Sequence, residues 1–294
     1  MLKTYEKVEE IKNKEMKRNN WEIAIGLNKV DNLTPSKYLK ELIEKSINGE
    51  NSYKEIETQL YKYYENKDLT KKEERDTREC DIVSTRIAEL LEDGSFTFSP
   101  IYLKSIHRYL FNGVFEGNIK DYVGVFRDYN ITKKENILNG KTVVYGNYQD
   151  LLDYLKYDFE EEKNIDYAKL SKEGQVKRIS KFTSAIWQVH PFAEGNTRTT
   201  AVFIEKYLRT KGYNINNDLF KENSLYFRNS LVLSNFSDIT LKVSSDFKYL
   251  HSFFSKLLIN HEEKLIEMKP IGFKENNNKK ELRTRKKINK GQER

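Results

Sequence analysis

Hydrophobic residues recur at helical spacing along most of the chain. In the first part, Pro35 and Gly49 bracket one such stripe, formed by Tyr38, Leu39, Leu42, Ile43 and Ile47. Ser52 and Glu55 then have the spacing of a capping box, and the next stripe consists of Ile56, Leu60 and Tyr63. Apolar side chains at such intervals line one face of a helix. The pattern therefore predicts a series of short amphipathic helices up to about residue 70.

Further stripes continue through the middle of the chain. They cover Cys80 to Leu91, a segment opened by Pro100, Leu151 to Phe159, Val176 to Val189, and Val202 to Leu208. A different pattern lies between Asn139–Gly140 and Gly146–Asn147, where Thr142, Val143, Val144 and Tyr145 form a β-like run. Turn residues on both sides of such a run are typical of a hairpin. The chain is thus predicted to be mainly α, a helical bundle with one small β-hairpin.

The pattern also divides the chain into three regions. Residues 1–70 form the first helical domain, and the charged stretch Asn66 to Glu79 is the predicted connection. Residues 76–265 form the main domain, and residues 266–294 form a basic tail. With only four Pro and 13 Gly in 294 residues, the composition also favours helices.

The positive charge is confined to that tail. Residues Lys269 to Arg294 contain ten Lys/Arg and three Glu, so they account for the whole net charge of +7. The rest of the chain is neutral, with 42 basic and 42 acidic residues. A run of this kind is typical of a solvated, disordered end, and the alternative is contact with a polyanion. The neutral main body argues against a nucleic-acid-binding domain.

Cellular location is constrained by three features. The single cysteine, Cys80, excludes a disulfide within the chain. The charged opening segment does not resemble a signal peptide, and no apolar run is long enough to cross a bilayer. We therefore expect a cytoplasmic protein with no membrane partner, or an effector exported by a route whose signal is not recognisable here.

The candidate chemistry is concentrated in the segment His190-Pro191-Phe192-Ala193-Glu194-Gly195-Asn196-Thr197-Arg198. One helical stripe ends before it and another begins after it, so it is predicted to be a tight loop between two helices. His190 can accept a proton near neutral pH, and Glu194 is an oxygen ligand suited to Mg²⁺. Backbone amides at the following helix start can bind an anion, and Arg198 adds a permanent positive charge. Together these groups predict a site for a metal-bound phosphate.

This segment resembles the Fic motif, His-x-Phe-x-[Asp/Glu]-Gly-Asn-[Gly/Lys]-Arg, at its fixed positions. Weaker resemblance to the Fic family extends over residues 76–240, including Ser105 to Phe111 and the hairpin at Gly140 to Asn147. The resemblance implies a helical Fic fold and transfer of AMP from ATP to a Tyr, Ser or Thr hydroxyl of a protein target. Family members often dimerise, so a homodimer is also implied.

The resemblance also implies a role for each site residue. His190 would be the general base, and Glu194 would hold Mg²⁺. Gly195, Asn196, Thr197 and Arg198 would bind the phosphates of ATP. The flap residues Thr142, Val143, Val144 and Tyr145 would bind the target by strand addition, unless they form an ordinary surface hairpin. Asn229 would contact the adenine, although packing explains its segment equally well.

Two positions depart from the family pattern. Thr197 replaces the usual second glycine, and Ala201 stands where many AMP-transferring members have a second arginine. Doc-like relatives also lack that arginine, bind the nucleotide reversed and transfer phosphate. AMP transfer is the favoured prediction, and transfer of phosphate or of another nucleotide-derived group is the alternative. A non-catalytic nucleotide-binding regulator is a further alternative, which the intact His190 and Glu194 disfavour.

The first domain resembles the small antitoxin partners of some Fic toxins, which carry [Ser/Thr]-x-x-x-Glu-[Gly/Asn] on an inhibitory helix. The corresponding register here is Leu27-x-x-x-Asp31-Asn32, and a second register, Thr85-x-x-x-Glu89, fits less well. We predict that Asp31 and Asn32 inhibit the enzyme, with the Asp31 carboxylate placed beside Arg198 in competition with phosphate. The alternative is that Asp31 only caps its helix.

Overall fold

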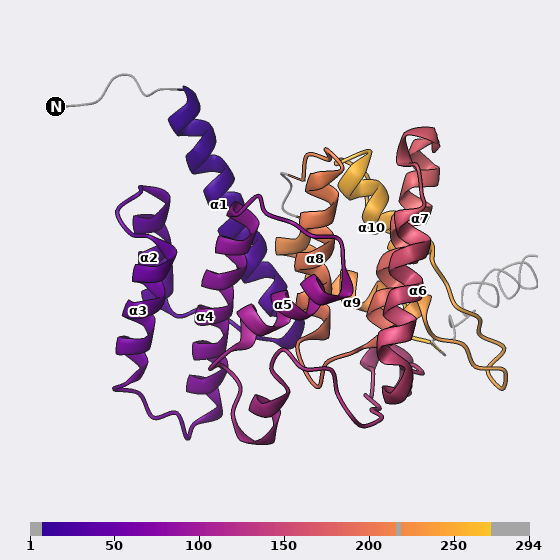
Figure 1. Cartoon of the computed structure of the whole chain (residues 1–294), viewed down its shortest axis with the longest axis horizontal. Helices are drawn as coiled ribbons and strands as arrows, with labels where there is room; N and C mark the ends of the chain where they lie inside the picture. Colours follow the sequence, from indigo (N-terminus) through magenta and orange to yellow (C-terminus); the bar gives the residue numbers. More distant parts are fainter. Residues whose placement is uncertain (1–7, 216–218, 272–294) are drawn as a thin grey trace, which may run out of the picture.

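The computed structural model describes residues 8–215 and 219–271, so most of the predicted tail lies outside the described residues. Ten α-helices fill the described part (Figure 1): α1 (Val8–Asn28), α2 (Lys37–Ile47), α3 (Tyr53–Tyr64), α4 (Lys72–Glu92), α5 (Pro100–Phe111), α6 (Leu151–Lys163), α7 (Lys172–Val189), α8 (Asn196–Thr210), α9 (Leu219–Ser234) and α10 (Lys248–Leu258). Five short 3₁₀ helices lie between them: Lys29–Asp31, Gly117–Tyr122, Asn136–Leu138, Tyr148–Asp150 and Tyr167–Lys169. The prediction of a mainly α fold is confirmed.

The predicted helix starts have the expected local chemistry. Ser52 and Glu55 form a capping box at the start of α3, in which each side chain binds the other residue's backbone N–H. Ser36 caps α2 by accepting a hydrogen bond from the Leu39 N–H. Pro100 is the first residue of α5, where its missing N–H costs nothing. Local signals therefore fix these boundaries.

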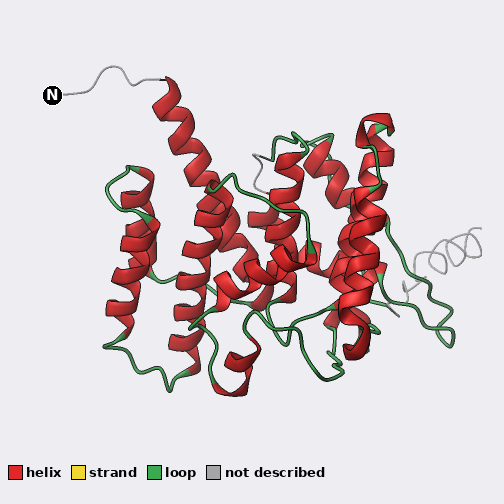
Figure 2. Ribbon diagram, in the orientation of Figure 1, coloured by secondary structure: helices red, strands yellow, loops and turns green. Residues whose placement is uncertain are grey.

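Three sequence-based expectations need correction. The first helix is not short, since α1 extends over 21 residues from Val8 to Asn28. The charged stretch Asn66 to Glu79 is only partly a connection, because α4 already begins at Lys72. The flap hairpin is not confirmed: no strand is present in the described ranges (Figure 2), and the only β-bridge found there joins Asp238 and Val243.

The hydrophobic core is continuous from α1 to α10. Helix α1 packs against both α4 and α9. Gly26 permits the second contact, because a Cβ atom at this position would lie 2.3 Å from the Lys221 Cα atom. Trp21 and Leu27 of α1 are buried in the same core as the main domain. The N-terminal segment is thus an integral part of the packing around the site, and its boundary at residue 70 stays a prediction.

The bundle holds the candidate loop between α7 and α8, with α5 packed against α8. Loop residues between α5 and α6 lie over the same end of the bundle in Figure 1. None of the described helices combines the length and the apolar character that crossing a membrane would require.

Candidate active site

The segment from His190 to Gly195 forms the predicted tight loop between α7 and α8. His190 ends α7 in the left-handed conformation, with φ 49°. Gly195 precedes α8 with φ 75°, and an added Cβ atom would lie 2.4 Å from the Phe111 ring. Glycine is therefore required at position 195 both by the backbone angle and by the close approach of α5.

Hydrogen bonds inside the loop keep its shape fixed. The Asn196 side chain accepts from the Phe192 N–H at 2.9 Å and donates to the Phe192 carbonyl at 2.8 Å. The buried Phe192 ring stacks on His107 of α5, with 3.9 Å between ring centroids. The Nδ1 atom of His107 accepts from the Gly124 N–H, so Nε2 bears the proton and donates to the Glu194 carbonyl. Burial lowers the pKa of His107 to about 4, which keeps it neutral in this role.

The His190 imidazole is arranged as a neutral base. Its Nδ1 atom lies 3.1 Å from the Trp187 carbonyl oxygen, which can only accept, so Nδ1 carries the proton. Nε2 then holds the lone pair, and no hydrogen bond to it is found within the described part of the chain. Burial lowers the pKa of His190 to about 3, against the effect of the Trp187 carbonyl. The imidazole is therefore neutral near pH 7, with its proton on Nδ1 and a free lone pair on Nε2.

The residues around His190 hold it tightly, and only 7% of its surface is exposed. The Tyr145 ring lies 4.3 Å from the imidazole, measured between centroids. The Tyr145 hydroxyl lies 3.3 Å from the buried Glu135 carboxylate, which pairs with Arg228 at 2.7 Å. Arg127 donates from Nε to the His190 carbonyl at 2.8 Å. These contacts orient the ring without occupying Nε2.

The start of α8 presents free backbone donors. The first amide with an intrahelical acceptor is that of Thr199, which binds the Gly195 carbonyl at 3.0 Å. For the amides of Asn196, Thr197 and Arg198, no acceptor is found in the described ranges, although these residues are buried. Unpaired buried amides at a helix N-terminus are well suited to bind an anion.

Thr197 has a specific structural role at its unusual position. Its hydroxyl oxygen accepts a hydrogen bond of 3.0 Å from the Trp187 indole N–H. Only 8% of Thr197 is exposed, so water cannot easily replace this partner. The larger side chain therefore satisfies a buried donor that a glycine would leave unpaired.

Arg198 is held by three oxygen-bearing side chains and is only 1% exposed. One guanidinium nitrogen donates to the Asn28 side chain at 3.0 Å, and another to Glu79 at 2.7 Å. The Nε atom lies 2.9 Å from the Asp31 carboxylate, in an ionic contact whose angle is outside that of a hydrogen bond. The guanidinium also lies 4.7 Å from the centroid of the Phe111 ring. Each of the three guanidinium nitrogens of Arg198, the predicted phosphate ligand, therefore contacts an oxygen atom of the protein.

The guanidinium of Arg198 and the carboxylates around it shift the pKa values of Arg198 and Glu79. Burial opposes the charge of Arg198, but Asp31 and Glu79 outweigh it and raise the pKa of the guanidinium. Burial raises the pKa of Glu79, and this exceeds the opposing attraction of Arg198. With Glu194 also close enough to raise the pKa of Glu79, three carboxylates surround one guanidinium.

Glu194 is half-buried, and its Oε1 atom accepts the Gly195 N–H at 3.0 Å. Among the described residues, no three or more His, Cys, Asp or Glu side chains are grouped to hold a metal ion. Mg²⁺ commonly binds through one or two carboxylates together with substrate phosphates and water. A single carboxylate beside free helix amides fits that donor set, and the other ligands would come from the nucleotide.

The flap segment is extended and anchored to α7. Val143 and Tyr145 are buried, whereas Val144 between them is 80% exposed. The Gln188 side chain donates to the Val144 carbonyl at 3.1 Å, and the Gly146 N–H donates to the Gln188 carbonyl at 3.2 Å. For the N–H groups of residues 142–145, no acceptor is found within the described chain.

Of the other predicted site residues, Asp31 lies at the loop, whereas Asn32 and Asn229 make no hydrogen bond to it among the described residues. Asp31 lies at Arg198, as expected, whereas Asn32 is exposed and in the left-handed conformation, with its N–H bound to the Lys29 carbonyl. Asn229 of α9 is half-buried and has no hydrogen bond to the loop among the described residues. The rival acid Glu89 binds the Tyr109 hydroxyl instead of Arg198.

Sequence reasoning missed several residues of the site, namely Asn28, Glu79, His107, Arg127, Glu135 and Arg228. The position of Asn28 could have been inferred, because it precedes Asp31 by about one helical turn. Glu79 lies in a charged stretch whose residues are not distinguishable by pattern. Its role depends on which side of α4 faces α8, and only tertiary packing determines that.

Comparison with known proteins agrees with this geometry. The sequence model of the Fic/DOC family matches residues 97–208. A probable protein adenylyltransferase from Sinorhizobium fredii is 30% identical over 141 residues, which cover 45% of this chain and 62% of the relative. The chain thus spans less than two thirds of that relative's length. No solved structure matched. Residues 97–208, which include the whole His190–Arg198 loop, therefore belong to the Fic/DOC family.

Proposed function

We propose that this protein transfers AMP from ATP to a hydroxyl side chain of a target protein. The main support is the position of a neutral imidazole, His190, one short loop away from the unpaired amides that start α8. A base and an anion cradle at this spacing suit attack of a hydroxyl on a phosphate. The name of the similar adenylyltransferase favours the same chemistry.

In the proposed reaction, Nε2 of His190 accepts the proton of the target hydroxyl. The oxygen forms a bond to the α-phosphorus of ATP, the bond from that phosphorus to the bridging oxygen breaks, and pyrophosphate leaves. The hydrogen bond from Nδ1 to the Trp187 carbonyl stabilises the imidazolium that forms. The backbone amides of Asn196 and Thr197 offset the negative charge on the phosphates.

Glu194 is the proposed ligand for Mg²⁺, which would neutralise phosphate charge when bound. The residue itself contributes a carboxylate that the Gly195 N–H holds in place at 3.0 Å. ATP and Mg²⁺ are accordingly the proposed substrate and cofactor.

The described conformation is proposed to be the inhibited one. Asp31 and Glu79 contact Arg198, so a phosphate could bind this guanidinium only by displacing carboxylates. Coulomb repulsion between phosphate and those carboxylates adds to the competition. Asp31 is thus proposed to inhibit through the arginine of the motif itself, since Ala201 occupies the position of the second arginine.

Two arguments favour the flap as the docking site for the target. The N–H groups of the half-buried Thr142 and the exposed Val144 have no acceptor among the described residues, which suits strand addition, and the segment ends beside the His190 ring. A target segment paired with Thr142–Tyr145 would therefore bring its hydroxyl to the imidazole.

Phosphate transfer is the second candidate, because Ala201 is buried and no arginine occupies that position. ATP labelled at the α or the γ phosphate distinguishes the two reactions. AMP transfer predicts that α label is incorporated and γ label is released with pyrophosphate. Incorporation of γ label alone would refute AMP transfer.

The proposal as a whole is tested by intact-mass analysis of the full chain after incubation with ATP and Mg²⁺. We expect an added mass of one AMP group in the wild type and none in His190→Asn, since asparagine tolerates the left-handed backbone but is not a base. His261→Ala, a substitution at an exposed histidine, is the control and should retain the modification. Equal modification of His190→Asn and wild type would exclude His190 as the base.

A further inference from the structure

A pocket of about 440 Å³ lies beside the flap, on the side that faces α6. Its lining includes Tyr145 and Gly146 of the flap, Tyr154, Tyr157 and Asp158 of α6, and Gln188 of α7. We call it the flap pocket. It is separate from the phosphate cradle at the start of α8, yet it shares Tyr145 with the surroundings of His190.

The flap pocket is formed before any target binds. Both hydrogen bonds of Gln188 attach the flap to the end of α7. Arg127 donates to the Gly146 carbonyl and to the His190 carbonyl, so it links the flap directly to the catalytic loop. These hydrogen bonds therefore fix the distance between the pocket and His190.

Asp158 gives the pocket its chemical character. It is half-buried, and no hydrogen bond or ion pair to its carboxylate is found in the described part of the chain. Burial raises its pKa to about 6, despite the nearby positive charges of Arg178 and Lys181. Arg178 is already paired with Glu162 at 2.6 Å, and Lys181 is exposed and not within ion-pair distance. The carboxylate thus lacks the partner that a buried acid usually has.

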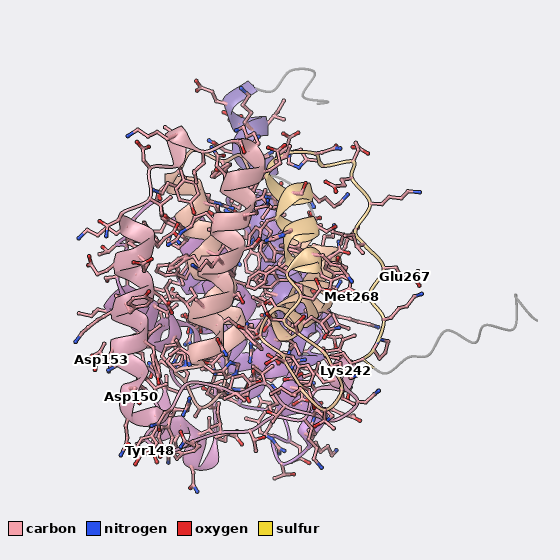
Figure 3. The ribbon with its side chains drawn as sticks, turned by 90° about the vertical axis from the view of Figure 1, so that its right-hand side faces the viewer. Tyr148, Asp150, Asp153, Lys242, Glu267 and Met268 are labelled. Carbon is pink, nitrogen blue, oxygen red and sulfur yellow. The ribbon has the colours of Figure 1, made fainter. Side chains whose placement is uncertain are left out.

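Two aromatic rings of α6 line the pocket together with this carboxylate. Tyr154 and Tyr157 are 43% and 67% exposed, so their rings are accessible to a ligand. Of the other acidic residues of α6, Asp153, Glu160 and Glu162 are each paired with a basic side chain, so Asp158 is the carboxylate that the pocket offers. Figure 3 shows Tyr148, Asp150 and Asp153 along one outer edge at the beginning of this helix. A carboxylate without a partner beside exposed tyrosine faces forms a favourable environment for a cation.

We propose that the flap pocket binds a lysine or arginine side chain of the target protein, from a residue that flanks the modified hydroxyl. The target segment would pair with the flap backbone, place its hydroxyl at His190 and insert the neighbouring cation between the tyrosines towards Asp158. The chain would then select its substrates by charge as well as by backbone pairing. This inference rests on the proposed docking of a target along the flap.

Binding of synthetic peptides to the full chain tests the proposal without nucleotide. The probes are fluorescein-labelled peptides with a central Tyr, Ser or Thr and a lysine on each side, and matched peptides in which both lysines are acetylated. We expect fluorescence anisotropy to give about tenfold tighter binding of the lysine peptides, the scale of a partly desolvated charge pair with cation–π contact. In Asp158→Asn this preference should disappear, whereas Asp153→Asn, on the exposed face of the same helix, should retain it.

Each outcome decides the matter. Equal binding of lysine and acetyl-lysine peptides to the wild type, or no binding of either, overturns the proposal. A preference that survives in Asp158→Asn, with melting confirming that the variant is folded, also overturns it. Loss of the preference in both variants would assign it to the general charge of α6 and overturn the pocket. A lysine peptide that binds through Asp158 but gains no label from α-labelled ATP would contradict the proposed AMP transfer and leave the pocket supported.

Discussion

Releasing Arg198 from its carboxylates should convert the chain into a tighter nucleotide binder. The informative variants are Asp31→Asn, Glu79→Gln and the double variant, which remove charge and keep side-chain size. Deletion of residues 1–70 is a poor test, because α1 supplies Trp21 and Leu27 to the common core. Point substitutions leave that core intact and alter only the electrostatics at the guanidinium.

The size of the effect follows from the two distances. At 2.9 Å for Asp31 and 2.7 Å for Glu79, the Coulomb energy of one ion pair is about 6 kcal/mol at an effective dielectric constant of about 20. Both carboxylates retain exposure, 25% and 21% of their side chains, so solvent reduces this value. We therefore expect each carboxylate to weaken phosphate binding at Arg198 by about 1 to 3 kcal/mol, which corresponds to about 5- to 150-fold in the Kd for the nucleotide.

Calorimetric titration with ATP and Mg²⁺ measures the change directly. We expect the Kd to fall about tenfold in each single variant, and by less than the product of the two in the double variant, because both carboxylates share one partner. Without nucleotide, the double variant should be less stable by about 3 kcal/mol, since the buried Arg198 loses both carboxylates that contact it and keeps only the attraction of Glu194. ATP should therefore raise its melting temperature more than that of the wild type.

The control is Glu41→Gln, which removes an exposed charge of α2 and should change neither quantity. An unchanged Kd in a folded double variant would refute the reasoning, because phosphate would then bind without needing Arg198. A lower Kd without increased self-modification would support competition between the carboxylates and phosphate for Arg198. It would refute only the idea that this competition inhibits the enzyme.

Three further predictions concern the catalytic loop. Gly195→Ala should lower the free energy of unfolding in urea by about 3 kcal/mol, because strain at positive φ and a clash with the Phe111 ring act together. Its control is Gly212→Ala, which has φ 81° but open space around it and should cost only about 1 kcal/mol. Thr197→Val should cost about 2 kcal/mol because the buried Trp187 indole N–H loses its acceptor, whereas Thr197→Ser should be close to wild type. Because the pKa of His190 is lowered to about 3, the base stays unprotonated down to that pH, so the rate of self-modification should not fall between pH 8 and pH 5; a decline centred near pH 6.5 would contradict this.

Local sequence signals were sufficient for most helices and for the loop. The capping box at Ser52, the proline at the start of α5 and the apolar stripes depend on residues close in sequence, and these were confirmed. The predicted hairpin was not confirmed, although the alternation of buried Val143 and exposed Val144 is typical of a strand. The Val144 carbonyl accepts a hydrogen bond from the Gln188 side chain instead of from a second strand. A pattern of period two predicts extended backbone and cannot reveal whether a partner strand exists.

The contacts of Arg198 could be predicted only in part. Motif spacing suggested a carboxylate from the first domain, and Asp31 does lie at the guanidinium. The contributions of Asn28 and Glu79 come from helices far apart in sequence, and they depend on how α1 and α4 pack against α8. Periodicity identifies the buried face of each helix, whereas the rotation that brings two faces together is determined by the whole core.

The departure from the family pattern at Ala201 is consistent with the contact between Asp31 and Arg198. Ala201 stands in place of a second arginine, and the Arg127 guanidinium is already bound to the backbone carbonyls of His190 and Gly146. Asp31 contacts the remaining guanidinium at the loop, that of Arg198. The proposed inhibitory contact and the proposed phosphate contact then use the same side chain, so they exclude each other directly rather than through a neighbouring residue. It follows that Arg198→Lys should weaken both: lysine lacks the planar fork that reaches Asn28, Asp31 and Glu79 at once, and it also binds phosphate as a single point charge. Loss of nucleotide affinity in Arg198→Lys without any change in the effect of Asp31→Asn would show that inhibition acts elsewhere.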